Sequence, residues 1–370
     1  MKVVVTGQVG LDKREFLERV AALATTQGFE TQCAHVGQRM YAETPGVQKG
    51  KILDLPIGQL EAIRRSAFKD ILREADDAPS LIVNTHATFR WNHGLFFAFD
   101  YDHMAELDAD LYIVLVDNID QVYRRLVRDG HRDFSLKDLM VWREEEIMAT
   151  EMLSRIVRRR GHFYICVRGE KDEHVETVVR LMHRPQMKKV YLSFPMSHVM
   201  DLPDVQAEID EFRAQMKQWF VCFDPADMES EKPLTFDAVD AAKAGQRYLT
   251  TGTGDQQVTL DVQEFIGIIP DIDGQIYVRD FMLIDQADMI VSLVPEMPGG
   301  KPAISSGVER ELHHAHETGR DVFVIWQPKC EPSPFITETC TKIFRSSQEA
   351  LDFFRDNGYA HEPTSGPLFG

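Results

Sequence analysis

Two short apolar segments separated by one helix constrain this chain more than any other feature. Residues 287–294 (Ala-Asp-Met-Ile-Val-Ser-Leu-Val) and 320–326 (Arg-Asp-Val-Phe-Val-Ile-Trp) are rich in β-branched residues, which favour strands. Between them, Glu309 to Thr318 has a helical pattern, and Gly319 provides a stop. A strand, a helix and a second strand predict a parallel α/β sheet, whose ligands bind at the edge where strands end.

The turn that opens this helix is Ser305-Ser306-Gly307, and it is suited to bind a phosphate. Small residues at a helix N-terminus leave N–H groups free for an anion. Glu311 lies one turn further on and could reach a sugar bound beyond that phosphate. Glu309 is the local competitor. Side chains two residues apart on a helix point about 200° apart, so only one of Glu309 and Glu311 should face the pocket. The alternative is an ordinary loop followed by a solvated acidic first turn.

Several motifs occur in a fixed order in the C-terminal half. Arg279-Asp280 precedes an apolar helix, Ala287-Asp288 precedes a strand, and Ser-x-Gly-Val-x-x-Glu-Leu ends at Leu312. Over roughly residues 188–330 the chain resembles the nucleoside 2-deoxyribosyltransferase superfamily, most closely its nucleoside 5′-monophosphate N-glycosidases. The resemblance implies a Rossmann-like (flavodoxin-like) fold, cleavage of a base–sugar bond by hydrolysis or base transfer, no required cofactor, and a homodimer or higher oligomer.

The resemblance also implies which residues form the site. A carboxylate placed under C1′ stabilises an oxocarbenium-like transition state or forms a glycosyl ester, and Glu311 stands at that position. Asp280 would bond sugar hydroxyls or help protonate the leaving base. For Tyr191 and Phe194, core packing is the alternative. The implied substrate-binding residues are Tyr191, Ser193, Phe194, Ser197, Arg279, Ser305, Ser306 and Gly307.

The N-terminus has the context of a phosphate-binding P-loop. An apolar strand over residues 1–6 is followed by Gly7-Gln8-Val9-Gly10-Leu11-Asp12-Lys13-Arg14 and by a helix over 15–27. The spacing from Gly7 to Lys13 fits a P-loop. Asp12, however, replaces the last glycine, and Arg14 replaces the hydroxyl residue that would bind Mg²⁺.

Alternating strands and helices over residues 1–183 predict a mostly parallel sheet. The order of the pieces resembles archaeal-type adenylate kinases, with a strand ending in Asn84-Thr85-His86-Ala87 and a basic helix over 120–128. The resemblance implies nucleotide binding, of ATP or another nucleotide, through Gly7, Gly10, Lys13, Arg128 and Arg132, with Arg124 and Arg125 as further candidates. The alternative for the arginines is a solvated basic helix face. Because of Asp12 and Arg14, we expect this domain to bind nucleotide, or only to hold the assembly together, without transferring phosphate.

The expected organisation has two domains. Residues 1–184 form the kinase-like domain, 185–189 a linker, 190–356 the glycosidase-like domain, and 357–370 a loose tail. The polar segment 227–275 is expected to be an insertion near the C-terminal site, either a lid or a subunit contact.

Composition limits the kinds of binding partner that the protein is expected to have. A formal charge of −18 argues against nucleic-acid binding, and the absence of a long apolar run argues against a membrane span. With a strand beginning at Lys2, no signal peptide is expected, which favours the cytoplasm. The five cysteines form no C-x-x-C pair, and His313, His314 and His316 fan around a helix, so no metal site is expected.

These observations favour an N-glycosidase acting on a nucleoside 5′-monophosphate, with the kinase-like domain binding nucleotide. Three alternatives stay open. The protein could be a nucleotide kinase with an accessory domain, or a non-catalytic nucleotide sensor or scaffold. It could also cleave NAD⁺ or another dinucleotide as a nucleotide-depleting defence effector.

Overall fold

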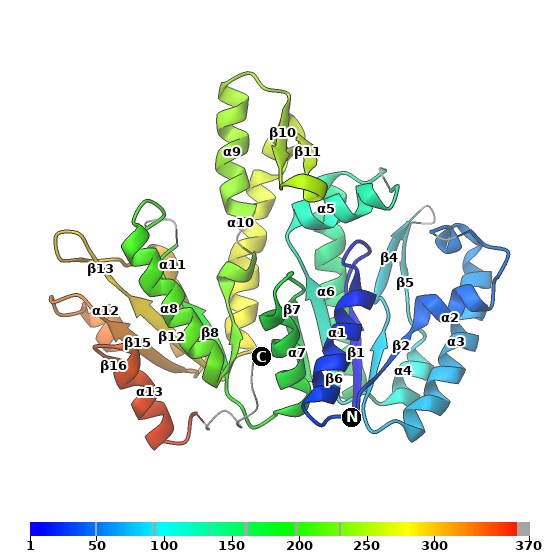
Figure 1. The fold of residues 1–370 in the computed structure, drawn as a ribbon, viewed down its shortest axis with the longest axis horizontal. Coiled ribbons are helices and arrows are strands. Elements are labelled where there is room, and N and C mark those ends of the chain that lie inside the picture. The colour runs from blue at the N-terminus through cyan, green and yellow to red at the C-terminus, as the bar shows by residue number, and fades with distance from the viewer. Residues whose placement is uncertain are drawn as a thin grey trace. The chain divides into compact units, whose positions relative to one another are not determined.

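The computed structural model describes residues 1–48, 50–91, 94–131, 133–158, 162–196, 199–228 and 231–360. The chain divides into two compact units, Met1–His183 with Met228–Ile272, and Arg184–Asp227 with Asp273–Gly370. Each unit contains a five-stranded parallel sheet covered by helices (Figure 1). The predicted α/β class with parallel sheets is confirmed.

The sheet of the first unit has the strand order β2-β3-β1-β6-β7. Each neighbouring pair is parallel, and the central β1 places Val3 opposite Ile82 on one side and opposite Leu111 on the other. The three valines of β1 are fully buried, as an apolar run in a doubly covered sheet should be. The strands are β1 (Lys2–Thr6), β2 (Gln32–His35), β3 (Leu81–Asn84), β6 (Leu111–Val116) and β7 (His162–Val167).

Helices and one hairpin surround this sheet. The apolar stripes of the helices form the core with the strands, and α1 packs against α7. The hairpin of β4 (Thr88–Trp91) and β5 (Gly94–Phe97) is antiparallel. The helices are α1 (Lys13–Thr26), α2 (Val36–Ala42), α3 (Ile57–Asp77), α4 (Tyr101–Leu107), α5 (Ile119–Arg128), α6 (Leu136–Arg158) and α7 (Asp172–His183), with a short 3-10 helix at Ile52–Asp54.

Residues 228–272 belong to the first compact unit, although they lie within the segment 190–356 that the sequence analysis assigned to the second domain. The segment contains α9 (Glu231–Lys243), an antiparallel pair of β10 (Tyr248–Thr251) and β11 (Val258–Asp261), and the start of α10 (Val262–Asp285). Two carboxylates attach it. Glu231 accepts the N–H of Ile119 at 3.1 Å, and Glu264 accepts the N–H of Leu136 at 2.6 Å. Both acceptors satisfy first-turn N–H groups of helices, which otherwise lack partners.

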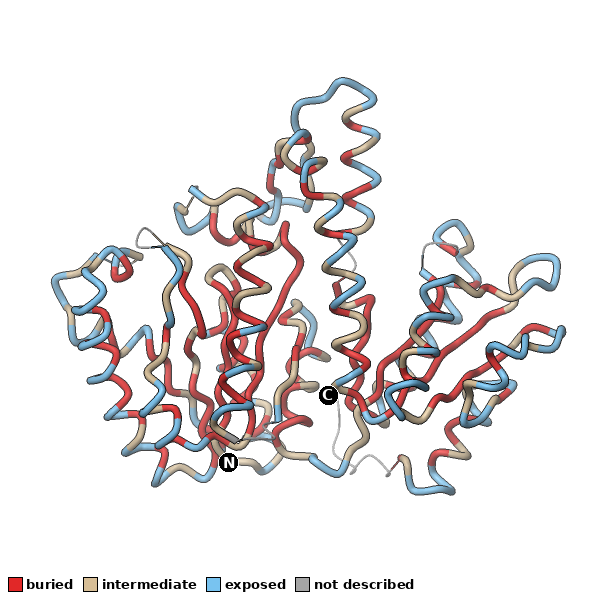
Figure 2. The backbone as a smooth tube through the Cα atoms, turned by 180° about the vertical axis from the view of Figure 1, so that it is seen from behind, coloured by how far each residue is buried: buried red, intermediate tan, exposed pale blue. Residues whose placement is uncertain are grey.

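The sheet of the second unit has the order β16-β15-β12-β8-β9, again with parallel neighbours. Numbered by their order within the unit, the strands run 2-1-3-4-5, the order of flavodoxin-like doubly wound sheets. The strands are β8 (Lys189–Ser193), β9 (Val221–Phe223), β12 (Met289–Val294), β15 (Asp321–Trp326) and β16 (Lys342–Phe344), and they are almost entirely buried (Figure 2).

Four helices and the end of α10 complete the second unit. They are α8 (Pro203–Trp219), α11 (Ser306–Glu317), α12 (Pro334–Thr337) and α13 (Ser347–Asp356). A 3-10 helix covers Pro225–Met228, and a small hairpin joins β13 (Glu296–Met297) to β14 (Lys301–Pro302).

The start of the expected C-terminal tail is packed. Tyr359 stacks on Phe353 with ring centroids 6.1 Å apart, and Ala360 belongs to the core of the second unit. Residues 361–370, the rest of that expected tail, lie outside the described residues. Within the part of the chain described, no helix is long and apolar enough to cross a membrane.

Candidate functional sites

The side chain of Glu311 is held by two hydroxyls from the neighbouring strand. Ser193 donates to one of its carboxylate oxygens at 2.6 Å, and Tyr191 donates to the other at 3.1 Å. Tyr191 and Ser193 are two residues apart on β8, so both point to the same face of the sheet, and both are fully buried. Glu309 on the same helix is exposed. The fold therefore turns Glu311, and not Glu309, toward the sheet.

These groups gather where the strand order of the sheet reverses. Ser193 is the last residue of β8, and β8 lies beside β12 in the parallel sheet. Ser292, on β12, donates a 3.3 Å hydrogen bond to the Ser193 hydroxyl and is also fully buried. The carboxyl edge at such a reversal is where open α/β sheets bind ligands. Ser292 was not anticipated, although it is the one polar residue in an otherwise apolar strand.

Two carboxyl groups with raised pKa values meet in this region. Burial raises the pKa of Glu311 to about 7, with a further contribution from the charge of Asp280, while the bonds from Ser193 and Tyr191 oppose the rise. Burial also raises the pKa of Asp280 to about 6, and Arg279 opposes this. Because the charge of Asp280 contributes to the raised pKa of Glu311, ionisation of Glu311 depends on the protonation state of Asp280. Burial and the charges of Glu311 and Asp280 also raise the pKa of Tyr191.

The helix α11 begins at Ser306, five residues before Glu311, with Ser305 as its N-cap. The Ser305 hydroxyl caps the helix by accepting the N–H of Val308 at 3.2 Å. The exposed Ser306 and Gly307 follow, and their N–H groups have no acceptor among the described residues. A Cβ atom on Gly307 would meet only the Ser305 hydroxyl, at an ordinary 3.5 Å. Packing within the protein therefore does not require a glycine at 307.

The remaining predicted substrate residues lie in different surroundings. The ring of Phe194 is buried in the core, edge-on to Phe212 at 6.5 Å, so it is not an exposed stacking surface. The sequence had left this packing role open. Arg279 is nearly buried on α10, beside Asp280. Ser197 lies outside the described residues.

In the first unit, the loop between β1 and α1 adopts a conformation that requires its glycines. Gly7 has φ 132° and Gly10 has φ 90°. A Cβ on Gly7 would lie 2.6 Å from the carbonyl oxygen of Leu115, and one on Gly10 would lie 2.9 Å from Leu126. Asp12 is also left-handed, with φ 47°, which explains why a glycine would fit its position.

The lysine of this loop is engaged by other parts of the protein. The Lys13 ammonium donates to the Gly7 carbonyl and lies 3.2 Å from the ring nitrogens of His86. Glu146, itself buried, lies 3.4 Å from the same histidine. Burial lowers the pKa of Lys13 to about 7 despite the charge of Glu146. Burial and the charge of Lys13 lower the pKa of His86 to about 4.

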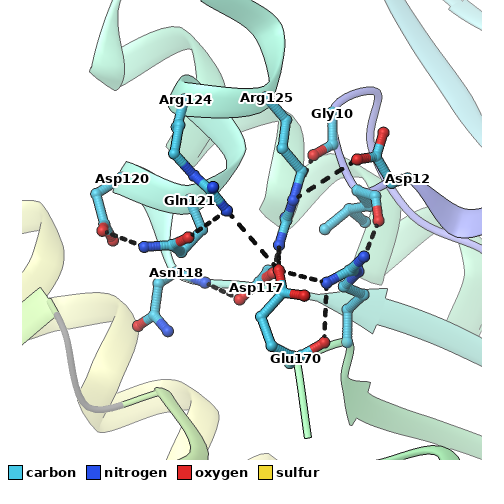
Figure 3. A network of polar contacts seen from close by, with 12 residues as sticks. Gly10, Asp12, Asp117, Asn118, Asp120, Gln121, Arg124, Arg125 and Glu170 are labelled. Carbon is cyan, nitrogen blue, oxygen red and sulfur yellow. Dashed lines mark hydrogen bonds and ion pairs between the residues drawn. The ribbon is translucent and has the colours of Figure 1, made fainter. Parts of the chain in front are cut away.

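Three of the arginines predicted to contact phosphates, Arg124, Arg125 and Arg128, form ion pairs with carboxylates of the chain, and Figure 3 shows Arg124 and Arg125 in this network. Arg128 donates to both oxygens of Asp12, at 2.9 and 3.0 Å. Arg125 is almost fully buried and lies 2.8 Å from both Asp117 and Glu170. Burial alone would raise the pKa of Glu170, but bonds from Arg168 and Arg125 hold it at about 2. Arg132 lies outside the described residues.

The local chemistry fits phosphate binding better than phosphoryl transfer. The backbone of the loop and Lys13 are the groups that bind phosphates in P-loops. However, no residue from Gly7 to Arg14 has a hydroxyl that could ligate Mg²⁺. In addition, the Asp12 carboxylate holds Arg128, so a bound phosphate would have to compete with it.

Comparison with known proteins bears on the first unit. Residues 6–143 match the sequence model of a family described as AAA domain. This match, with the loop geometry and the parallel sheet, identifies a P-loop, kinase-like nucleotide-binding domain at the N-terminus. The matched segment is less than half of the chain and does not extend to Glu311. No curated protein matches the chain.

Proposed function

We propose that the second unit cleaves the N-glycosidic bond of a nucleoside 5′-monophosphate, with Glu311 as the reacting carboxylate. The observation that carries this proposal is the placement of Glu311, bonded by Ser193 and Tyr191 at the edge where such sheets bind ligands. Glu311 is half-buried, its pKa is about 7, and its hydrogen-bond partners Ser193 and Tyr191 are not basic. An ionised carboxylate in this position destabilises the fold, and groups with such shifted pKa values cluster at functional sites.

The proposed chemistry uses the ionised form of Glu311. Its carboxylate attacks C1′ or stabilises positive charge there, while the C1′–N bond breaks and its electron pair leaves with the base. The base takes a proton from the acid form of Asp280 or from water. Water then cleaves the glycosyl ester and releases the sugar phosphate. If a second base replaces water, the same steps give base transfer.

The hydroxyls of Ser193 and Tyr191, which donate hydrogen bonds to Glu311, would serve two purposes. By donating hydrogen bonds they favour the carboxylate over the neutral acid, against the effects of burial and Asp280. They also fix the orientation of the carboxylate, because Tyr191 and Ser193 come from a buried strand and cannot easily move. In this proposal the free N–H groups of Ser306 and Gly307 receive the 5′-phosphate.

The test is to measure free base released from a panel of ribo- and deoxyribonucleoside 5′-monophosphates, with NAD⁺ and ATP included, by liquid chromatography. Glu311→Gln should reduce release by about a thousandfold or more, as expected for loss of a reacting group. Glu309→Gln, an exposed carboxylate on the same helix, is the matched control and should retain activity. Release of no base from any substrate by the wild-type protein would refute the proposal.

The phosphate contact has a separate test in Gly307→Ala. The added methyl group fits the free protein, so folding should be unaffected. If the 5′-phosphate packs against this turn, KM for monophosphates should rise while any activity on the unphosphorylated nucleoside should not change. An equal effect on both substrates would place the phosphate elsewhere.

The AAA domain match favours a second candidate function in the first unit, as a nucleotide kinase or a nucleotide sensor. The two forms are distinguished by incubating the protein with ATP, Mg²⁺ and each nucleoside monophosphate and measuring ADP. We expect nucleotide binding without ADP formation, because of Asp12 and Arg14. ADP formation that is lost in Lys13→Met would instead assign kinase activity to this unit.

A further inference from the structure

The edge strand of the first unit brings together three side chains that prefer the same kind of metal ion. Cys33 and His35 alternate on β2 and therefore point to one face, where α1 presents Glu18. The Cys33 sulfur, a His35 nitrogen and a Glu18 oxygen all lie within 4.8 Å of one another. Spacing along the sequence gave no sign of this set, because Glu18 is on a different element.

We propose that Glu18, Cys33 and His35 form a Zn²⁺ site with one open position. Thiolate, imidazole and carboxylate are the ligands of tetrahedral zinc, and a thiolate disfavours Mg²⁺, Ca²⁺ and Mn²⁺. Bond lengths of about 2.0–2.3 Å place tetrahedral ligand atoms roughly 3.5 Å apart. Since all three atoms lie within 4.8 Å of one another, no pair needs to approach by more than about 1.3 Å, and the His35–Glu18 pair, now 2.9 Å apart, needs to separate slightly. Water fills the fourth position.

Asn84 supplies the outer support that such a histidine needs. It lies at the end of β3 with its side-chain amide 2.9 Å from Nδ1 of His35, while Nε2 lies 2.9 Å from Glu18. An asparagine can donate to this nitrogen through its NH₂ group or accept from it through its oxygen. In the structure the amide nitrogen of Asn84 faces Nδ1. When Nε2 binds the metal, Nδ1 carries the proton, and a 180° turn of the Asn84 amide places its oxygen to accept the hydrogen bond. Ligating histidines usually make this second contact to a carbonyl or carboxylate.

The site has one buried and one exposed ligand, and it has a path to solvent. His35 is buried, whereas the Glu18 side chain is about half exposed at 54%. Glu18 also lines an open depression of about 660 Å³ beside Asp12 and Arg128. Zinc can therefore approach from this side, with Glu18 moving to complete the set. The Cys33 thiol, which now donates to the Leu17 carbonyl at 3.4 Å, loses its proton to solvent when the metal binds.

The experiment uses the full chain without an affinity tag, first stripped of metal with a chelator. Co²⁺ is added as a probe, and its absorption is recorded. One equivalent should give a near-ultraviolet thiolate-to-cobalt charge-transfer band and visible bands of tetrahedral intensity, and Zn²⁺ should displace them. Metal analysis of the untreated protein should find zinc at about one per chain.

The variants separate this site from adventitious binding. Cys33→Ser should abolish the charge-transfer band, whereas Cys340→Ser, which alters another partly buried thiol, should retain it. Asn84→Leu removes the acceptor for His35 and should weaken binding by about 10–100-fold, while Asn84→Asp keeps an acceptor and should bind well. The exposed Glu18→Gln variant tests the third ligand with little risk to folding. Absence of the band in wild type, or its persistence in Cys33→Ser, would overturn the proposal.

Discussion

The P-loop of the first unit and the Glu311 region of the second treat buried charge in opposite ways. Around the loop, Arg125 and Arg128 each have carboxylate partners, and Glu170 is held ionised by two arginines. Around Glu311, burial and the charge of Asp280 oppose ionisation of the carboxyl group, and the hydrogen-bond donors to Glu311 are neutral hydroxyls. The first arrangement stabilises the charges it contains, while the second leaves them poorly compensated.

This difference suggests which region was shaped for chemistry. A group that acts near neutral pH needs a pKa close to that pH, which burial beside a like charge provides. The arginine–carboxylate network beside the P-loop has no such poise, although burial lowers the pKa of Lys13, in the loop itself, to about 7. A ligand that binds the arginines must first compete with their internal ion pairs. The comparison predicts that charge removal will weaken the first region and stabilise the second.

The largest effect is expected from Arg125→Leu. It leaves Asp117 buried without its partner, which should destabilise the first unit by about 3–5 kcal/mol. Arg128→Leu is the matched control, since its ion pair with Asp12 is exposed and should contribute less than about 1 kcal/mol. Calorimetry of the full chain measures both. Equal losses in the two variants would remove the contrast between buried and exposed pairs.

Glu311→Gln should increase the stability of the protein, opposite to Arg125→Leu, and the gain should depend on pH. Between pH 4.5 and about 7 the unfolded state ionises at this residue while the folded state stays protonated, so the native protein loses stability as pH rises. The loss is complete above pH 7 and amounts to no more than about 3 kcal/mol, given the half-buried position. The variant should therefore raise the transition temperature at pH 8 and leave it almost unchanged at pH 4.

Glu309→Gln provides the control for that measurement. Its exposed carboxylate should give no comparable gain at pH 8. A Glu311→Gln variant that is less stable than wild type at pH 8 would show that the carboxylate is compensated after all.

Asp12→Gly tests whether the loop's own carboxylate competes with phosphate. Glycine accepts the left-handed backbone at this position, and the change removes a negative charge and releases Arg128. ATP should bind about tenfold more tightly, or about 1.4 kcal/mol, by titration calorimetry. Asp129→Asn, which removes the other carboxylate on Arg128 but leaves the loop unchanged, should have a smaller effect. Unchanged ATP affinity in Asp12→Gly would contradict this competition.

The smallest predicted effects are shifts in the pH profile of base release. In the proposed mechanism the acid limb of this profile reports the ionisation of Glu311, whose pKa is about 7. Ser193→Ala removes a bond to the carboxylate and should move the limb to higher pH, whereas Asp280→Asn removes a like charge and should move it to lower pH. The same two directions should appear in the pH dependence of the transition temperature, independently of activity. Shifts of the same sign in both variants would contradict the coupling.

The sequence alone determined the elements and the local geometry of both loops. Apolar runs predicted most strands of both sheets, because burial of apolar residues imposes that pattern, but not the edge strands β2 and β16. Helix geometry allowed only one of Glu309 and Glu311 to face the pocket, and the spacing from Gly7 to Lys13 predicted a P-loop. These features depend on residues close together in the chain, so local rules suffice.

The tertiary structure decided which distant residues meet. It placed Phe194 in the core, joined Asp12 to Arg128, and brought His86 and Glu146 to Lys13. It also grouped residues 228–272 with the first unit, through carboxylates that accept N–H groups of α5 and α6. The pairing of a charge with a partner a hundred residues away depends on how the sheets and helices stack, and composition or spacing along the chain carries no record of that.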